Sequence, residues 1–291
     1  MILRDTLAVI GGSGAHHVLQ QQANALSRVG PITTPYGPSS PIFKARVEDT
    51  AFLFLPRHGE TGYNVAAPWV NYRANIYALK EVGVTRILAW TGPGAINPQL
   101  QIGQYVLPHD VVDLTQGRET TFYKNTGLGF IRQFPVFCPE VVAATGFVLH
   151  RLGYPYMDHG VYVCTQGPRL ETPEEIKWYR KQGADMVGMT LVPEVFLARE
   201  LEMCYTPICY ITNYAEGVRE RDNKPGELFE GLLGSSERDA MDEAIHNFLP
   251  IAMELARALP RDRGCTCGLS MERYRREGRI ENDWHTWVST Q

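Results

Sequence analysis

The chain has 291 residues, of which 44% are hydrophobic and 21% are charged, and its formal net charge is −4. This length predicts one large domain or two small ones with a sizeable buried core. The slightly acidic balance gives no indication of a nucleic acid or an anionic membrane as a partner. Arg4 and Asp5 interrupt the N-terminal apolar run, and no stretch of about 18 uninterrupted apolar residues follows. We therefore expect a cytoplasmic protein without a membrane span.

The first half of the chain alternates between strand and helix patterns. A first strand and a turn are predicted for TLAVIGGSG, residues 6–14, and a second strand with a polar loop for AFLFLPRHG, residues 51–59. A helix that ends at Gly83 is predicted for NYRANIYALKEVG, because its apolar residues recur at helical spacing. A third strand into a glycine loop is expected in VTRILAWTGPGAIN, and a fourth extended run in GQYVLPHDVVDL.

The next part of the chain continues the same pattern. A helix is predicted for residues 139–152, and a strand that leads into a loop for GVYVCTQGPRLET. The following helix has clear start signals, since Thr172 is suited to the N-cap, Pro173 to the first helical position and Glu175 to a capping box.

The remaining core elements lie between residues 184 and 258. Residues 184–201 predict a short strand, a loop and a helix, and Tyr205 to Thr212 read as a last buried strand. Residues 226–258 look helical, with interruptions around Gly234 and Pro250. The alternation predicts an α/β fold, with residues 1–259 as a single domain in which helices flank a central mixed twisted sheet. Residues 260–291 lose the periodicity and are expected to form a peripheral tail.

The cysteines show no metal-site spacing along the chain. Four of them, Cys138, Cys164, Cys204 and Cys209, lie in apolar or strand-like surroundings that suit reduced core thiols. No CxxC pair or Cys/His ladder occurs, so we expect no metal. The pair Cys265 and Cys267 in the polar tail leaves open a tight, redox-labile disulfide.

Glycines and polar residues follow the predicted strands, at the edge where ligands bind in open α/β sheets. In GGSG, the amides of Gly11, Gly12 and Gly14 suit an anion and Ser13 adds a hydroxyl, although a plain turn explains the same letters. His17 stands where a dinucleotide fingerprint needs its third glycine, and no GK[ST] sequence follows.

Further donors follow other strands. Arg57 and His58 end one strand, Thr91 and Gly92 another, and Thr190 a third. The planar arginine fork suits a tetrahedral oxyanion, while a surface Arg-His pair is the simpler alternative. Together the guanidinium, imidazole, hydroxyl and amide donors suit inorganic phosphate.

Several of these stretches occur together in one known family. GPRLETPEE, GADMVGMTLVPEVFLAREL and ITNYAEG, with GGSG, PRHG, NYRANIYALKEVGV and TGPGAINPQLQIGQ in the same order, resemble the trimeric purine nucleoside phosphorylase and methylthioadenosine phosphorylase family. The resemblance covers roughly residues 7–255. It implies a nucleoside phosphorylase-like fold and attack of phosphate, the co-substrate, on the anomeric carbon of a purine nucleoside. Neither a metal nor an organic cofactor is implied.

The resemblance also assigns roles to residues of this chain. It implies a phosphate site made of Ser13, Arg57, His58, Gly92 and Thr190, with Thr91 adjacent, and it places Met189 against the ribose.

Two further residues correspond to the positions that read the base. Asn213 suits donation to N7 and O6 of a 6-oxopurine, and Glu171 suits acceptance from its N1–H. Members that prefer 6-aminopurines carry an aspartate in place of Asn213 and another two residues on, where this chain has Ala215. Leu170, beside Glu171, is placed with the substrate-binding residues.

The sugar end of the site is less defined. Leu228 and Phe229 are apolar candidates for a 5′ pocket, which leaves inosine, guanosine and 5′-methylthioinosine open as substrates. Phe130 falls where the family offers a residue to a neighbouring subunit, which implies a homotrimer or a dimer of trimers. The alternatives are an S-methyl-5′-thioadenosine phosphorylase that releases adenine, a hydrolase of the same bond and a non-catalytic purine-binding protein.

Overall fold

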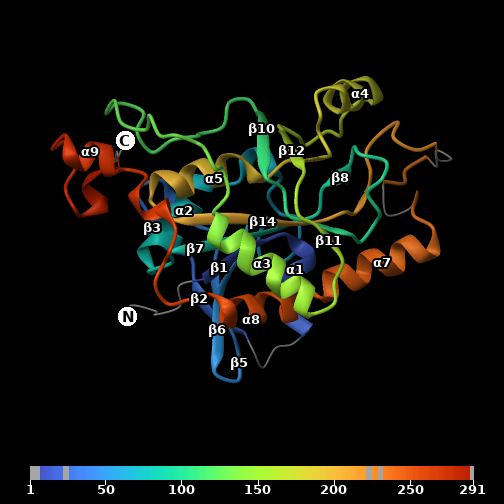
Figure 1. Ribbon diagram of the computed structural model, residues 1–291, viewed down its shortest axis with the longest axis horizontal. Helices are drawn as coiled ribbons and strands as arrows, with labels where there is room; N and C mark the ends of the chain where they lie inside the picture. The colour runs from blue at the N-terminus through green and yellow to red at the C-terminus, as the bar shows by residue number, and fades with distance from the viewer. Residues whose placement is uncertain (1–6, 22–25, 221–224, 229–231, 289–291) are drawn as a thin grey trace.

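The computed structural model describes residues 7–21, 26–220, 225–228 and 232–288, and its centre is a mixed sheet covered by helices on both faces (Figure 1). This sheet has eight strands in the order β11 (Tyr156–Met157), β9 (Tyr105–Val106), β14 (Cys204–Tyr210), β7 (Arg86–Thr91), β1 (Leu7–Gly11), β6 (Thr50–Pro56), β5 (Ile42–Val47) and β2 (Leu26–Gly30). The four strands β14, β7, β1 and β6 run parallel, whereas β5 and β2 continue the sheet in antiparallel fashion. The predicted α/β fold with a mixed sheet is confirmed.

A second sheet lies beyond the ends of the parallel strands. Its order is β10 (Asp110–Leu114), β12 (Val161–Thr165), β13 (Met186–Gly188), β8 (Gly94–Ala95) and β15 (Asn213–Tyr214), and a two-stranded ribbon pairs β3 (Thr33–Thr34) with β4 (Gly37–Pro38). Loops that leave β7 and β14 therefore enter this second sheet directly, as β8 and β15.

The helices are α1 (Ser13–Gln21), α2 (Tyr72–Glu81), α3 (Pro139–Arg151), α4 (Pro173–Lys181), α5 (Leu191–Glu200), α7 (Ser235–His246), α8 (Phe248–Ala258) and α9 (Glu272–Arg276). The parallel strands are apolar on both faces, because Ala8 and Ile10 of β1 join the core with α2 and α5 while Leu7 and Val9 join the core with α1 and α8. This two-sided burial explains the unbroken apolar runs of the sequence.

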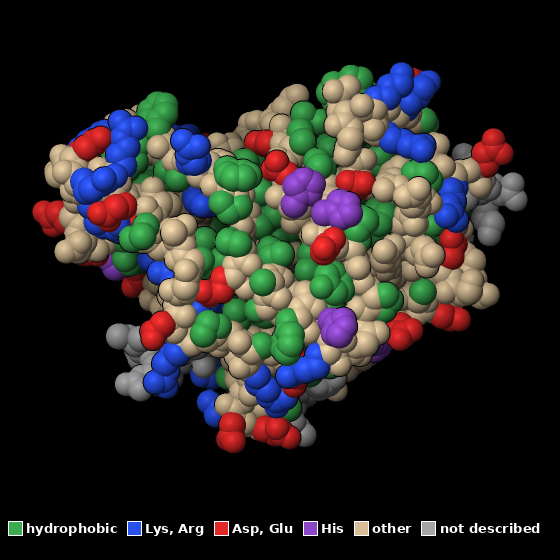
Figure 2. Space-filling model, viewed as in Figure 1, with side chains coloured by type: hydrophobic (Ala, Val, Ile, Leu, Met, Phe, Trp, Pro, Cys, Tyr) green, Lys and Arg blue, Asp and Glu red, His purple; other side chains and the backbone are tan. Residues whose placement is uncertain are grey.

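Across the face shown in Figure 2, side chains of both charge signs are interspersed with apolar ones.

Local signals fix two helix starts. The Thr172 hydroxyl accepts from the Glu175 amide and the Glu175 carboxylate accepts from the Thr172 amide, so the predicted capping box is confirmed. Gly234 precedes α7 as expected, but Pro250 lies in the first turn of α8, where a proline is tolerated. The break falls instead at Asn247, between the two helices.

The C-terminal segment is not the peripheral tail that its sequence predicts. Met271, Tyr274 and Trp287 are at most 3% exposed and belong to the main core. The ion pair between Arg275 and Glu202 joins α9 to the turn that follows α5. Met271 and Tyr274 lie three residues apart, but Trp287 is thirteen residues further on, so no sustained helical or strand period marks the segment. Within the described ranges, no helix is both long and apolar enough to cross a membrane.

Candidate active site

The predicted phosphate-binding residues meet at the ends of neighbouring strands. Ser13 begins α1 directly after β1, although its side chain lies outside what the structure describes. Arg57 follows β6, and its backbone amide donates to the Gly11 carbonyl at 3.0 Å, which joins the PRHG and GGSG loops. Thr91 ends β7, and Thr190 lies between β13 and α5.

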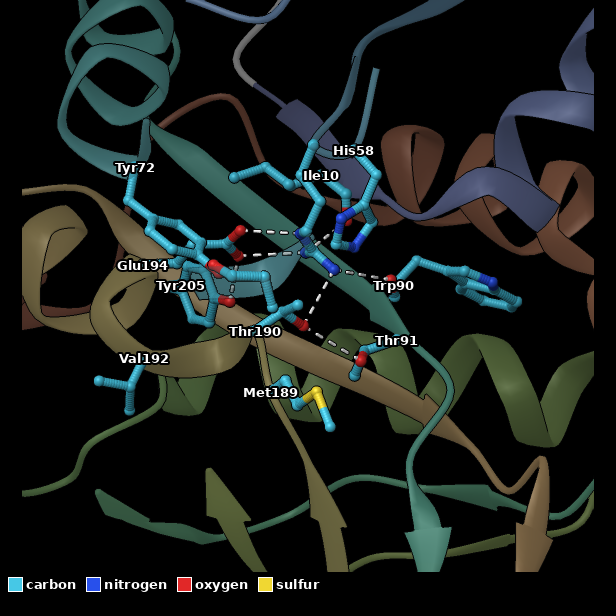
Figure 3. Close-up of polar contacts among 12 residues, drawn as sticks. Ile10, His58, Tyr72, Trp90, Thr91, Met189, Thr190, Val192, Glu194 and Tyr205 are labelled. Atoms are coloured by element: carbon cyan, nitrogen blue, oxygen red, sulfur yellow. Dashed lines mark hydrogen bonds and ion pairs between the residues drawn. The ribbon is translucent and has the colours of Figure 1, made fainter. Parts of the chain in front are cut away.

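All five N–H bonds of Arg57 point to protein acceptors. The acceptor residues Ile10, Trp90, Thr190 and Glu194 are labelled in Figure 3. Nε and Nη2 donate to the two carboxylate oxygens of Glu194 at 2.8 and 3.1 Å. The remaining donors reach the Thr190 hydroxyl at 3.2 Å and the carbonyls of Ile10 and Trp90 at 3.1 and 3.5 Å.

This arrangement is a buried ion pair. Arg57 is 2% exposed and Glu194 is 1% exposed. Burial acts against the charged form of Arg57 and is the largest single effect, but attraction to Glu194 and the smaller effects of Tyr205 and Tyr72 together outweigh it and raise the arginine pKa. Tyr205 also donates its hydroxyl to Glu194 at 2.7 Å. Arg57 was predicted from the sequence but Glu194 was not, and the position of Glu194 inside an apolar helix pattern is the one signal that could have found it.

His58 is uncharged at neutral pH. Burial and the neighbouring Arg57 lower its pKa to about 4. Its Nδ1 lies 2.8 Å from the Val65 carbonyl, which only accepts, so Nδ1 carries the hydrogen. Nε2 is therefore an acceptor. The imidazole stacks on the ring of Tyr63, with 4.0 Å between the two ring centroids, and this contact fixes its orientation.

The two predicted threonines form a hydroxyl pair. Their Oγ1 atoms lie 3.4 Å apart, and Thr190 makes no side-chain capping bond to α5. Gly92 follows Thr91 in a space that admits no side chain, because a Cβ there would lie 2.5 Å from Cγ2 of Thr212. The chain thus requires glycine where its backbone approaches the site.

Met189 precedes Thr190 in the chain, and its side chain packs against Gly167 in the loop that follows β12. Gly167 has φ +63°, and a Cβ at this residue would lie 2.4 Å from the Met189 sulfur. Arg118 holds the same region, donating to the carbonyls of Met189 and Val192 at 2.6 Å each and of Gln166 at 2.8 Å. Arg118 was not predicted from the sequence, because it is an isolated arginine in the stretch QGRET and belongs to no motif.

A cavity of about 690 Å³ opens beside this loop. It is lined by the ends of β10 and β12, by the loop that contains Glu171 and by residues of α4. Glu171 Oε1 accepts from the Thr165 hydroxyl at 2.6 Å, while Oε2 has no hydrogen-bond partner in the described part of the chain. The volume falls in the range of small-molecule pockets.

Asn213 lies outside the lining of this cavity, across β13 and β8 in the same sheet. Three strand spacings separate β12 from β15, which is about 14 Å. The Asn213 amide is oriented, since Nδ2 donates to the Tyr214 carbonyl at 3.0 Å and Oδ1 accepts from the Thr212 hydroxyl at 2.8 Å. One N–H of Nδ2 is left for a ligand. Gly94 packs against the Asn213 amide, since a Cβ added at Gly94 would lie only 3.1 Å from Nδ2.

The other predicted substrate residues have diverse settings. Ala215 is buried and Leu170 is half-buried, and neither lines the cavity. Leu228 is 59% exposed, and Phe229 lies outside the described residues. Phe130 is 81% exposed, and its backbone amide donates to the Tyr274 hydroxyl at 2.9 Å.

Comparison with known proteins identifies the family. Residues 6–256 match the model of the phosphorylase superfamily. A 6-oxopurine nucleoside phosphorylase of Pyrococcus furiosus is 37% identical over 90% of this chain and 96% of its own. A probable S-methyl-5′-thioinosine phosphorylase of Methanothermobacter thermautotrophicus is 36% identical over 90% and 87%.

Solved structures share the fold. A methylthioadenosine phosphorylase from an Antarctic soil metagenomic library superposes with a TM-score of 0.76 at 27% identity, covering 91% of this chain and 90% of its own. The methylthioadenosine phosphorylase of Schistosoma mansoni in complex with tubercidin gives 0.73 at 28% identity, covering 88% and 92%. The resemblance drawn from the sequence motifs is confirmed.

Proposed function

This chain belongs to the phosphorylase superfamily, and we propose that it cleaves 6-oxopurine nucleosides with inorganic phosphate. The observation that carries this proposal is the continuity of the site. The buried donors around Arg57 and Thr190 lead through Met189 and Gly167 to the cavity beside Glu171. Phosphate and a nucleoside would then lie next to each other.

The phosphate subsite relies on neutral donors. Glu194 already balances the charge of Arg57, and every Arg57 N–H has a protein acceptor. We therefore assign Arg57 a positioning role, in which it fixes the Thr190 hydroxyl. The hydroxyls of Thr91 and Thr190, the Gly92 backbone and the N-terminus of α1 are the groups that bind the anion. Neutral His58 offers Nε2 as an acceptor for the proton of hydrogen phosphate.

The base is read by two side chains from opposite sides. Asn213 donates its remaining N–H towards N7 and O6, and Glu171 accepts from N1–H through Oε2. An adenine base carries a donor at position 6 and an acceptor at N1, so both contacts would be mispaired. Each unpaired buried group costs about 1–3 kcal/mol. A 6-oxopurine preference of several powers of ten follows if both contacts are lost.

These contacts also support the chemistry. A phosphate oxygen forms a bond to C1′ of the sugar as the C1′–N9 bond breaks, and the bonding electrons pass into the purine. Negative charge then develops at N7 and O6, where the preorganised Asn213 donor stabilises it. The products are the free purine base and the sugar 1-phosphate, and the step requires no metal.

The 5′ group and the assembly form the finer part of the proposal. Phe130 and Phe134 are each 81% exposed on one loop, and an aromatic pair of this kind suits contact with another copy of the chain. We propose a homotrimer, or a dimer of trimers, in which Phe130 completes the sugar site of its neighbour. Light scattering would give the assembly, and Phe130→Ala is expected to raise KM for the nucleoside.

Initial rates test the proposed function. The substrates are inosine, guanosine, 5′-methylthioinosine, adenosine and 5′-methylthioadenosine, each measured with and without phosphate. Release of hypoxanthine or guanine that requires phosphate, with much slower release of adenine, is the expected result. Faster adenine release would favour the methylthioadenosine phosphorylase alternative, and release without phosphate would favour a hydrolase.

A further inference from the structure

Four cysteines from three distant segments of the chain meet in one cluster. Cys138 precedes α3, Cys204 begins β14, and Cys265 and Cys267 lie in the C-terminal segment. Their four Sγ atoms all lie within 4.8 Å of one another, and those of Cys204 and Cys265 are 3.4 Å apart. All four are free thiols, and three of them are buried. The disulfide left open for Cys265 and Cys267 is not formed in this structure.

We propose that this cluster is a structural Zn²⁺ site with four thiolate ligands. Zn–S bonds of about 2.3 Å in a tetrahedron place sulfur atoms about 3.8 Å apart. The separations found here, none above 4.8 Å, are compatible with that geometry. Four sulfur ligands in a tetrahedral arrangement favour Zn²⁺ among common divalent cations. Binding would displace the thiol protons to solvent and leave four Zn–S bonds with no change of oxidation state.

A buried arginine with a donor that is free within the described residues lies beside the cluster. Arg86 of β7 is paired in register with Cys204 of the neighbouring strand. It donates to the Glu140 carboxylate, two residues after Cys138, and to the Asp262 carbonyl, three residues before Cys265. Arg86 is fully buried, and its Nη1 has no hydrogen-bond partner in the described part of the chain. An unpaired buried donor is costly, and thiolates bound to a metal would be suitable acceptors.

The site would fasten the C-terminal segment to the core. Gly264 donates to Glu140, and Arg263 donates to the Glu202 carbonyl at 2.7 Å, so the segment already folds back over the cluster. Further along the same segment, Tyr274 accepts from the amide of Phe130. A metal at the cysteines would therefore stabilise the support beneath the exposed Phe130 loop. Stabilisation of the Phe130 loop would follow from zinc binding alone, and only an effect of this loop on catalysis rests on the proposed function.

The metal content of the full-length protein tests the site. The wild type, expressed with zinc in the medium and purified without chelators, is expected to hold about one zinc ion per chain by elemental analysis. The double variant Cys265→Ser/Cys267→Ser is expected to lose at least nine-tenths of this zinc. The matched control is Cys209→Ala, which removes a buried cysteine outside the cluster and should retain the metal.

A spectroscopic measurement on the wild type does not depend on the folding of any variant. After displacement of the zinc by a mercurial and its removal, Co²⁺ is added. Intense visible bands and a near-ultraviolet thiolate-to-cobalt band are expected, since they report tetrahedral sulfur ligation. Wild-type protein without zinc, in which the cluster cysteines resist alkylation until a reductant is added, would overturn the proposal in favour of disulfides. Zinc retained by the double variant, or bound iron in its place, would overturn it as well. None of these readouts uses nucleoside cleavage, so a failure here is separate from a failure of the proposed function.

Discussion

Replacement of Glu194 by glutamine tests the buried ion pair that organises the phosphate subsite. The change keeps the shape of the side chain but removes its charge. One of the two oxygens that accept from Arg57 becomes an NH₂ donor. Arg57 then remains in the core with a positive charge, and two donors face each other.

The expected cost follows from the burial of both partners. Arg57 and Glu194 are at most 2% exposed, so water cannot replace the lost carboxylate. Removing one partner of a buried pair costs about 3–5 kcal/mol, because the other charge is left uncompensated. The Thr190 hydroxyl would also lose its fixed position, and we expect a higher KM for phosphate along with the lower stability.

Glu200→Gln is the matched control. Glu200 ends the same helix and is 5% exposed, but it has no ionic partner among the residues that the structure describes. Burial raises its pKa to about 7, against the opposing hydrogen bonds from Thr121 and Phe122. A neutral side chain is therefore tolerated there, and we expect a loss of about 1 kcal/mol or less.

Urea unfolding at pH 7 and equal protein concentration, followed by circular dichroism, gives both free energies of unfolding. The account requires Glu194→Gln to lose at least about 2 kcal/mol more than Glu200→Gln. Equal losses would refute the reasoning, because they would show that Glu194 does not neutralise Arg57.

Three further predictions concern the same site. The His58 pKa is lowered from 6.5 to about 4, so as the pH falls the unfolded chain binds a proton before the folded chain does, and stability is lost between these two values. His58→Asn should reduce this acid-induced loss of unfolding free energy, measured by urea unfolding, by about 3 kcal/mol. An unchanged dependence of stability on pH would contradict the assignment of a buried, neutral His58. Asn213→Asp should raise the rate of adenine release relative to hypoxanthine release, and an unchanged ratio of the two rates would show that Asn213 does not read the base. Glu171→Gln should lower kcat/KM for inosine about 10- to 100-fold, and an unchanged kcat/KM would show that Glu171 does not read it. Arg118→Lys should lower kcat/KM about tenfold, because one ammonium group cannot replace the guanidinium that donates to the carbonyls of Met189 and Gln166. The surface variant Arg257→Lys is the control, and equal activity of the two variants would count against a positioning role for Arg118.

Local patterns in the sequence predicted much of the framework. The capping box at Thr172 depends on residues three apart, and the buried parallel strands appear as unbroken apolar runs because both of their faces are covered. The glycine and hydroxyl residues after those strands were predictable as one site, since parallel strands deliver their ends to the same edge.

Contacts between distant segments were not predictable in this way. Glu194 looks like part of an apolar helix until the fold brings it 2.8 Å from Arg57, which is 137 residues away in sequence. The cysteine cluster has no motif spacing, because its members come from three separate segments. The buried residues of the C-terminal segment are too few to form a sustained period, so the pattern does not reveal that Met271 and Trp287 belong to the core. Such pairings are set by tertiary packing, which local sequence does not encode.

The reaction products test the central claim most directly. Inosine and a known amount of phosphate are incubated with the protein, hypoxanthine is quantified by chromatography, and the phosphorus species are followed by ³¹P NMR. The account predicts that phosphate is consumed and that ribose 1-phosphate appears in equal amount to hypoxanthine. Hypoxanthine together with free ribose and unconsumed phosphate would contradict phosphorolysis.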